Sequence, residues 1–538
     1  MKMRRRVLIT AALPYANGDI HIGHIMSTYL PADIYKRYLK LRGAEVIYVC
    51  GSDDHGTPIA LSARKRGITP LEHANYYRER QLRDFERMGI EFDIFYRTHS
   101  PENEILVREF LIEARRKGLL YKKQTKQYRC PNCKMYLPDR FVIGTCPFCG
   151  APNQYGDYCE VCGRQIPPGA LINPRCAICG TPAEVKDVTH IFFKLSALAE
   201  DLRRRLLETK PHEEAMNYAL RRIEEGLKDR DISRENYRGF KMPFEDTPNL
   251  YVYVRVDAPR GYVAATRKRA KEHGYDLMYR RGKDSPTEII HFIGKDIIYH
   301  HFLFRPAMLM VREIFKLPTR FVVNGFLLLE GKKMSKSRGR YIKIADVTEK
   351  YDREYVRFYL ATKARNRLKD ENRRRKDFEE RINSDLIGNI GNLIHRVNVL
   401  LYRLLEGIPQ PEEMEPEDKR MISLAEELLK KAEMKYEAVN LGGVIDELLR
   451  IAGEGNAYLA KTEPRKNTSV APGVITALLY LNAAIVTVLH PIMPEHTRKI
   501  RNLRGLDEFY REVPDVSKIR LKEKPKAPFK KIRVEEAS

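Results

Sequence analysis

Residues 7–24, VLITAALPYANGDIHIGH, decide the fold of this chain. The apolar run 7–13 predicts a short buried strand, and residues 14–19 predict a turn. Apolar residues at helical spacing follow from His21 onward. A strand that feeds a helix N-terminus forms a ready anion site, because free N–H groups and the helix dipole point at the ligand. His21 and His24 lie three residues apart, so both can face one side of the first helical turn.

A second cluster, GKKMSKSRG, occupies residues 331–339. It offers four cations, two hydroxyls and flanking glycines, which suits a mobile lid over a polyphosphate. Each motif alone is a weak signal, because paired histidines occur by chance and a lysine–serine cluster is usually a solvated loop. Both motifs in one chain, in this order, are hard to obtain by accident.

The two motifs resemble the signatures of class I aminoacyl-tRNA synthetases, and further segments resemble the methionyl enzymes of archaeal type. These segments are residues 11–18, 50–59, 231–234, 256–259 and 292–299. The similarity extends from residue 7 to about residue 465. The resemblance implies ATP-dependent activation of methionine to an adenylate, followed by transfer to tRNA.

The resemblance also implies a role for individual side chains. The expected catalytic residues, acting on the ATP phosphates that Mg²⁺ bridges, are His21, His24, Lys333 and Lys336. The expected substrate-binding residues are Ala12, Leu13, Tyr15, Asp53, Arg234, Asp257 and His301. The expected ATP-binding residues are Gly23, Gly294, Lys295, Asp296 and Lys336. Asp53 would hold the substrate ammonium group, with a helix cap at the strand end as the alternative, and for Arg234 the alternative is a structural ion pair.

A tRNA-binding surface is expected on the C-terminal helices. Asn392 and Arg396 lie four residues apart on one helix face, and the resemblance implies that both meet anticodon bases, with Arg465 in the same region. Amide and guanidinium groups suit unstacked single-stranded bases. The alternative is an ordinary basic helix surface.

Cysteine spacing predicts two structural zinc sites. Eight of the nine cysteines form four CxxC pairs, with gaps of 12, 9 and 13 residues: Cys130/Cys133, Cys146/Cys149, Cys159/Cys162 and Cys176/Cys179. Each pair supplies two thiolates for tetrahedral zinc, and disulfides are not expected in a cytosolic chain. Spacing leaves sequential, nested and interleaved pairing open. The resemblance pairs the two middle CxxC units and leaves the outer two for the second metal. Cys50 lies in an apolar run and is expected in the core.

The composition of the chain favours an intracellular protein that binds nucleic acid. The chain has 538 residues, 43% of them hydrophobic, and a net charge of +25, which favours several domains and a polyanionic ligand. No apolar run is expected to reach the ~20 residues of a membrane-spanning helix. The basic residues 4–6 followed by a short apolar run mimic a signal peptide, but no cleavage site follows. We therefore expect a cytoplasmic monomer.

The predicted fold class is α/β: a Rossmann-like parallel-sheet catalytic domain with an inserted zinc-knuckle domain and a C-terminal α-helical bundle. The expected boundaries are 1–115 and 226–325 for the two halves of the catalytic domain, 116–225 for the insertion, 326–375 for the second motif and connector, 376–515 for the bundle and 516–538 for a disordered basic tail.

The chain contains no tryptophan. Where the family usually has tryptophan, this sequence has Arg255, Arg305, Tyr341 and Arg465, and His300 replaces an expected aromatic hydrocarbon ring. A buried guanidinium is costly without partners, so we expect Arg255 to face solvent or to pair with a carboxylate such as Asp257 or Asp53. Two alternative functions therefore remain: another class I synthetase, or a tRNA-binding protein with the same fold and impaired methionine activation.

Overall fold

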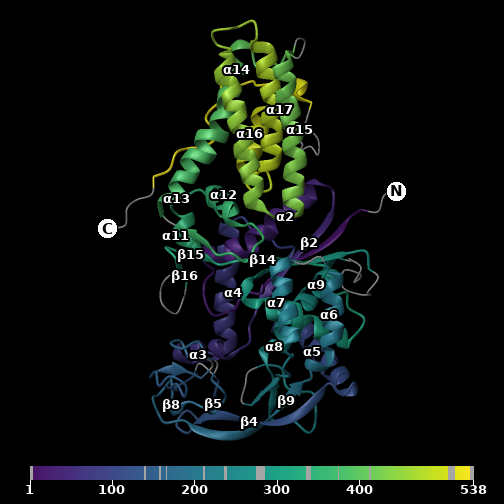
Figure 1. Cartoon of the computed structure of the whole chain (residues 1–538), viewed down its shortest axis with the longest axis vertical. Helices are drawn as coiled ribbons and strands as arrows, with labels where there is room; N and C mark the ends of the chain where they lie inside the picture. The colour runs from purple at the N-terminus through teal and green to yellow at the C-terminus, as the bar shows by residue number, and fades with distance from the viewer. Residues whose placement is uncertain are drawn as a thin grey trace.

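The computed structural model describes residues 4–138, 141–156, 159–164, 166–209, 212–235, 239–273, 285–334, 341–373, 375–410, 414–506 and 515–533. Within them, a parallel sheet lies at the centre, an insertion carries the cysteines below it, and a helix bundle stands above it (Figure 1). The α/β fold class predicted from the sequence is confirmed.

The central sheet is parallel, with the strand order β14-β13-β1-β2-β3. Its strands are β1 (Arg6–Ala11), β2 (Glu45–Ser52), β3 (Ile94–Arg97), β13 (Glu288–Gly294) and β14 (Arg320–Asn324). Their apolar runs are almost completely buried, as expected for a sheet covered on both faces. The sheet order reverses at β1, which pairs with β2 on one side and β13 on the other. Ligands in such sheets bind beyond the strand carboxyl ends at this point.

Helices cover both faces and connect the strands. They are α1 (Ile22–His24), the π-helix η1 (Ile25–Tyr29), α2 (Leu30–Leu41), α3 (Thr57–Lys65), α4 (Pro70–Arg87), α5 (Pro101–Arg116), α8 (Val254–Asp257), α9 (Gly261–His273), the π-helix η7 (His300–Phe304) and α10 (Arg305–Val311). Thr69 caps α4 through a capping box with Glu72, and Ser100 caps α5 through Asn103. Both caps satisfy free N–H groups where the sequence places Pro in the first turn.

The insertion is a long antiparallel ribbon that carries the cysteines at its end. The ribbon strands β4 (Leu120–Cys130) and β9 (Glu184–Phe193) pair along their length, with β5 (Met135–Leu137) and β10 (Arg230–Asp231) at the edges. A smaller sheet consists of β6 (Val142–Thr145), β7 (Gln154–Tyr155) and β8 (Ile172–Cys176). Two helices, α6 (Ala199–Glu208) and α7 (Glu213–Glu224), complete it.

Short elements connect the sheet to the bundle. They are β11 (Ser233–Glu235), β12 (Leu250–Val252), β15 (Leu327–Leu329), β16 (Lys332–Lys333), β17 (Glu371–Arg373), α11 (Ile344–Thr348) and α12 (Arg353–Lys363). The short 3-10 helices are Ser196–Leu198, Ala258–Arg260, Lys295–Ile297 and Val516–Lys518.

The bundle consists of α13 (Arg375–Glu380), the π-helix η8 (Arg381–Gly391), α14 (Asn392–Leu404), α15 (Pro416–Glu437), α16 (Leu441–Thr462), α17 (Ala471–Leu489) and α18 (Pro494–Leu503). Helix α17 is central and packs against α14, α15, α16 and α18.

Helix α17 corrects one expectation from the sequence. Its 19 residues are long and apolar enough to cross a membrane, although no run of that length was expected. However, 83% of its apolar window is buried inside the bundle. A helix that is apolar all round is the ordinary choice for such a central position.

The expectation of a disordered tail is also wrong for the described residues 515–533. Ile519, Leu521 and Phe529 are buried. The Ile532 N–H donates to Asn383, whose amide donates back to the Ile532 carbonyl. The tail therefore packs along the bundle because its basic residues are interleaved with apolar ones.

Candidate active site

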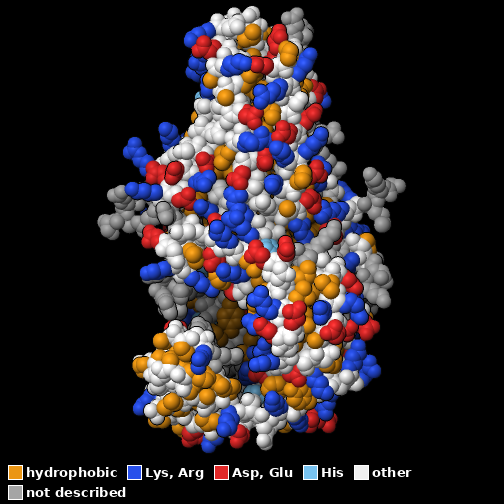
Figure 2. All heavy atoms as spheres, viewed as in Figure 1, with side chains coloured by type: hydrophobic (Ala, Val, Ile, Leu, Met, Phe, Trp, Pro, Cys, Tyr) orange, Lys and Arg blue, Asp and Glu red, His pale blue; other side chains and the backbone are white. Residues whose placement is uncertain are grey.

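A cavity of about 290 Å³ opens at the carboxyl edge of the central sheet, where the strand order reverses. Residues predicted from both sequence motifs line it together with strand-end residues: Ala12, Leu13, Tyr15, His21, Gly23, His24, Gly294, Asp296 and Lys333. We call this cavity the crevice. Figure 2 shows a hollow between the lobe that carries the cysteines and the rest of the molecule.

The first motif forms the N-terminus of helix α1. The backbone N–H of Gly23 donates to Nδ1 of His21 at 3.2 Å, and the backbone N–H of His21 donates to Nδ1 of His24 at 3.3 Å. The two imidazole rings stack with centroids 3.6 Å apart. This reciprocal cap fixes both rings at the helix start, where the dipole favours an anion.

The second motif lies beside the first. The Ile22 N–H donates to the Ile342 carbonyl at 3.2 Å, and His21 pairs with Lys343 in a β-bridge. On the other flank, Lys333 lines the crevice, and its Nζ lies 3.6 Å from the centre of the Phe326 ring. Lys336 lies outside the described residues.

Two glycines of the crevice allow close approach. A Cβ at Gly23 would lie 2.8 Å from the Met334 side chain, and a Cβ at Gly294 would lie 2.7 Å from Oδ1 of Asp296. Asp296 lines the crevice directly, but Lys295 does not appear in its wall. The Lys295 Nζ instead lies 2.6 Å from the Asp370 carboxylate. Lys295 therefore forms a structural ion pair in the unliganded chain.

Asp53 follows β2 at the same edge. It continues the β1–β2 pairing, because its N–H donates to Pro14 and its carbonyl accepts from Ala16, both at 2.9 Å. Its Oδ1 atom is buried without a hydrogen-bond partner. Burial and the neighbouring Asp257 raise the pKa of Asp53 well above the usual range. Gly56, not Asp53, is the N-cap of helix α3, so the helix-cap alternative for Asp53 does not apply.

Tyr15 lies against this segment. A Cβ at Gly56 would lie 1.6 Å from the Tyr15 hydroxyl, and Gly56 has a φ of +125°, a conformation suited to glycine. Leu13 lies two residues before Tyr15, the Ala12 carbonyl accepts from the Tyr29 hydroxyl at 2.9 Å, and Tyr15 forms a β-bridge with Asp53. The turn therefore presents Tyr15 toward Asp53.

Arg234 and Arg255 share Asp231. An ion pair joins Arg234 to Asp231, and Nη1 of Arg255 lies 3.0 Å from the same carboxylate. The expectation that Arg255 pairs with a carboxylate is therefore confirmed, but the partner is Asp231 at the edge of the insertion ribbon and not Asp257 or Asp53. Burial opposes the charge of Asp231, but the two guanidinium groups outweigh it and lower its pKa.

His301 contacts a residue that the sequence reasoning missed. Its Nδ1 lies 3.1 Å from the Ile297 carbonyl, so this nitrogen carries the proton, and its Nε2 accepts from the Tyr262 hydroxyl at 2.9 Å. Burial lowers the pKa of His301 to about 3. His301 is therefore a neutral group with a fixed tautomer, and Tyr262 is its orienting partner.

Arg305 is buried near His301 and pairs with no carboxylate of the described residues. It is 1% exposed, its Nη1 lies 2.7 Å from Nε2 of His291, and its Nη2 has no partner. Burial lowers the pKa of Arg305 to about 10. His300, by contrast, is exposed.

Both cysteine groups form compact clusters that could hold a metal. The first consists of Cys130, Cys133, Cys176 and Cys179, and the second of Cys146, Cys149, Cys159 and Cys162. The cysteines are free thiols, with Sγ–Sγ distances of 3.5–4.0 Å within each cluster. Tetrahedral zinc with Zn–S of about 2.3 Å requires roughly 3.8 Å between sulfurs, so both clusters fit. The pairing of the middle two CxxC units agrees with the resemblance.

The backbone of each knuckle supports this geometry. The residue after the second cysteine has positive φ in all four CxxC units: Lys134, Gly150, Gly163 and Gly180. Glycine suits this left-handed turn. In three of the units, a backbone N–H also donates to the first cysteine's sulfur. The other cysteine, Cys50, is fully buried in β2 as expected.

The three residues expected to meet the anticodon lie on or near the predicted bundle helices. Asn392 and Arg396 both lie on α14 and are half-buried, while Arg465 is exposed after α16. The Asn392 amide donates to Oδ1 of Asn456 at 3.0 Å. Asn392 is therefore partly committed to packing within the bundle.

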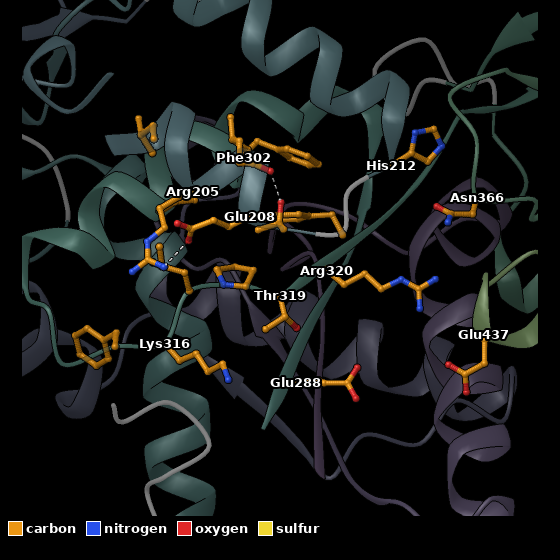
Figure 3. A pocket seen from close by; sticks show the side chains of 18 of the residues that line it. Arg205, Glu208, His212, Glu288, Phe302, Lys316, Thr319, Arg320, Asn366 and Glu437 are labelled. Carbon is orange, nitrogen blue, oxygen red and sulfur yellow. Dashed lines mark hydrogen bonds and ion pairs between the residues drawn. The ribbon is translucent and has the colours of Figure 1, made fainter. Parts of the chain in front are cut away.

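A second cavity, with a volume of about 720 Å³, lies elsewhere. Glu288 and Arg320 line it, and these residues begin β13 and β14, so it opens at the amino edge of the sheet. Figure 3 shows Arg205 and Glu208 near one end and Asn366 and Glu437 near the other. We assign chemistry to the smaller crevice because helix N-termini and signature residues converge only on the carboxyl edge.

Known proteins resemble the chain over nearly its whole length. The family description "tRNA synthetases class I (M)" matches residues 7–398. Methionine–tRNA ligases from Pyrococcus abyssi and Methanocaldococcus jannaschii are each 38% identical, over 98% of this chain and 76% and 79% of theirs. A Mycobacterium tuberculosis methionyl-tRNA synthetase solved with methionyl-adenylate shares the fold, with a TM-score of 0.79 and 22% identity, over 98% of this chain and 100% of that one.

The family match covers the sheet, the insertion and the start of the bundle. It includes both signature motifs and all eight clustered cysteines. The chain therefore belongs to the class I tRNA synthetases of the methionyl type.

Proposed function

We propose that this chain ligates methionine to its tRNA through a methionyl-adenylate formed from ATP. The observation that carries the proposal is the convergence of both signature motifs on one crevice. Relatives named methionine–tRNA ligases and a similar fold bound to methionyl-adenylate support it. The methionine carboxylate attacks the α-phosphate of ATP, the bond to pyrophosphate breaks, and the adenylate then passes to the terminal ribose of tRNA.

The roles of the crevice residues follow from position and charge. His21 and His24 receive the phosphates at the start of α1, and Lys333 with Lys336 stabilises the developing charge. Gly23 and Gly294 give the nucleotide room beside Asp296, and Lys295 can join by leaving Asp370. Mg²⁺ bound with ATP would supply further positive charge to the phosphates beside His21, His24 and Lys333.

The amino acid lies deeper in the same crevice. Asp53 holds its ammonium group, while Ala12, Leu13 and Tyr15 form the wall next to it. Asp257 stands behind Asp53, and Arg234 fixes the insertion edge through Asp231. His301, kept neutral by burial and oriented by Tyr262, faces the methionine side chain and needs no counter-charge.

The two thiol clusters hold structural zinc, because four sulfurs close each site and leave no position for substrate. We also propose that the chain works as a cytoplasmic monomer and that Asn392, Arg396 and Arg465 meet the anticodon.

Pyrophosphate exchange measured with each of the twenty amino acids tests the activity. Exchange with methionine alone is the expected result. Exchange with another amino acid would identify a different class I synthetase. No exchange, with tRNA binding retained, would identify a tRNA-binding protein whose pocket Arg255 and Arg305 have disabled.

The tRNA step has its own test. Binding should weaken steeply with salt as counterions are released. Replacing Arg396 with alanine should reduce discrimination between anticodons by about 1–3 kcal/mol, whereas replacing the exposed Lys522 should weaken all tRNAs alike. Equal weakening on cognate and non-cognate tRNAs by Arg396→Ala would make Arg396 a phosphate contact.

A further inference from the structure

A chain of hydrogen bonds joins a buried carboxylate beside the crevice to the surface. Oδ2 of Asp257 lies 2.6 Å from Nδ1 of His55, and Nε2 of His55 lies 2.8 Å from Nδ1 of His99. Asp257 is 0% exposed and His55 is 5% exposed, whereas His99 is exposed to solvent. The three groups therefore form a continuous path for a proton.

The inner end of this path faces Asp53. Asp53 and Asp257 each keep an Oδ1 atom that is buried and without a hydrogen-bond partner. Burial, and then the charge of Asp257, raises the pKa of Asp53, and burial also raises the pKa of Asp257. Two buried carboxylates in mutual repulsion cannot both stay ionised without a cation.

Among the described residues, the nearby arginines do not supply that cation. Asp54 is neutralised by Arg97, whose Nε lies 3.0 Å from Oδ2 of Asp54. Tyr15 and Tyr253 are the neighbouring phenols, and burial followed by Asp53 raises the pKa of Tyr15. Arg78 faces Asp54 from α4. The positive charge that balances the carboxylate pair therefore comes either from a proton shared with His55 or from a ligand.

The histidines differ in their hold on a proton. Burial opposes the charge of His55, but Asp257 outweighs it and raises the pKa of His55. Partial burial, together with His55 and Arg97, lowers the pKa of His99. His99 stacks against Phe240 with interplanar angle 8°, which fixes its ring at the mouth of the path.

We propose that His55 and His99 are positioning residues that link binding of the substrate's ammonium group to release of a proton from the Asp53–Asp257 pair. This proposal rests on the proposed function, because it takes methionine as the ammonium donor at Asp53. The carboxylate pair gives one proton to Nδ1 of His55, Nε2 of His55 gives one to Nδ1 of His99, and Nε2 of His99 gives one to water. One positive charge enters with the ammonium and one leaves, so the net charge of the site is unchanged.

Isothermal titration of methionine into the full chain, in buffers of different ionisation enthalpy, measures the protons released. The wild-type chain should release up to one proton per methionine, and its affinity should rise by up to about tenfold per pH unit where the pair titrates. A methionine analogue without the amino group should bind without proton release.

The variant His55→Gln keeps an amide donor for Asp257 but cannot carry a charge. It should flatten the pH dependence of methionine affinity. The matched control is His496→Gln, because His496 also pairs with a buried carboxylate, Glu354 at 2.8 Å, far from the crevice. The control should retain the wild-type profile. His99→Phe, which keeps the stack on Phe240, should shift the profile if His55→Gln does not fold.

Methionine binding without buffer-dependent heat would overturn the proton link and leave the proposed function intact. An unchanged pH profile in a folded His55→Gln variant would overturn the role of His55. Absence of both methionine binding and pyrophosphate exchange would overturn the proposed function and this inference together.

Discussion

The two thiol clusters and the crevice use their polar groups in opposite ways. In each cluster four sulfurs converge on one another, and the local turns supply backbone donors to them. Beside the crevice, whose wall includes neither of them, Asp53 and Asp257 keep buried oxygen atoms without partners. The clusters are therefore complete once a metal is bound, whereas the crevice is complete only with a substrate.

This difference indicates that the thiol clusters mainly stabilise the fold, whereas the crevice mainly binds substrate. A closed tetrahedral site contributes its binding free energy to folding. An unsatisfied buried polar group costs free energy in the unliganded protein, and that cost is recovered when a ligand provides the missing partner. Changes in the two regions should consequently affect different measurements.

The largest effect is expected from breaking a thiol cluster. Cys159→Ser should remove one of two zincs and unfold the knuckle region locally, because structural zinc stabilises small domains by about 10–16 kcal/mol in isolation. Elemental analysis and limited proteolysis measure both effects. Cys50→Ala is the control, since Cys50 lies in β2 outside the clusters, and it should retain both metals. Retention of two zincs by Cys159→Ser would remove that cluster from the comparison.

Two buried arginines allow the same comparison between satisfied and unsatisfied polar groups within the catalytic domain. Arg357 is 1% exposed and binds Asp33 at 2.8 Å, whereas Arg305 contacts no carboxylate in the part of the chain that the structure describes. Arg357→Met should destabilise the chain by about 3–5 kcal/mol, because it leaves Asp33 with a weaker counter-charge, while Arg305→Met should be neutral or stabilising by up to about 4 kcal/mol. Denaturant unfolding measures both. Equal losses would mean that Arg305 is as well satisfied as Arg357.

The crevice itself should respond in rate and not in stability. Lys333→Ala should lower kcat for adenylate formation by about 10²–10³-fold with KM for methionine little changed, because its charge acts on the transition state. Lys332→Ala is the matched control: the two lysines are neighbours on β16, where successive side chains point to opposite faces, and Lys332 does not line the crevice. Similar losses in both variants would indicate a general basic surface.

Sequence predicted the closed region better than the open one, for a physical reason. A CxxC unit closes over four residues, so spacing alone identified all eight cysteines, although their pairing needed the resemblance. The strand and helix start around His21 are equally local. The crevice is formed by segments that are distant in the sequence. Their proximity could be predicted only from the expected parallel sheet.

Errors arose where long-range packing decides. Arg255 pairs with Asp231 at the edge of the insertion, and no local sequence pattern indicated this partner. Helix α17 is apolar because it is central to the bundle, and the tail is ordered because Ile519 and Phe529 find apolar partners there. Tyr262, His55 and His99 were missed as partners, since each acts through a contact that the folded chain creates. The site roles and domain boundaries remain predictions.

The smallest expected effect is a pH dependence at the turn that positions the first motif. Asp84 on α4 is 7% exposed, and its Oδ2 accepts from the Ile20 N–H at 3.1 Å, next to His21. Burial raises the pKa of Asp84 from 3.8 to about 6. Because the folded pKa is higher than the unfolded one, the stabilisation is fully present below pH 3.8 and is lost as pH rises through about 6.

Asp84→Asn tests this dependence, because the amide oxygen still accepts from Ile20 but cannot ionise. Between about pH 4 and 7 the wild-type chain should lose about 1–3 kcal/mol of unfolding free energy relative to the variant. Denaturant unfolding at several pH values gives the difference. If the unfolding free energies of wild type and Asp84→Asn change with pH in parallel, ionisation of Asp84 does not destabilise the fold. The turn would then resemble the thiol clusters, where the polar groups have partners. A divergence that develops between pH 3.8 and about 6 and stays constant above that range would place the strain at Asp84 itself, at the point where the helix presents His21 to the crevice.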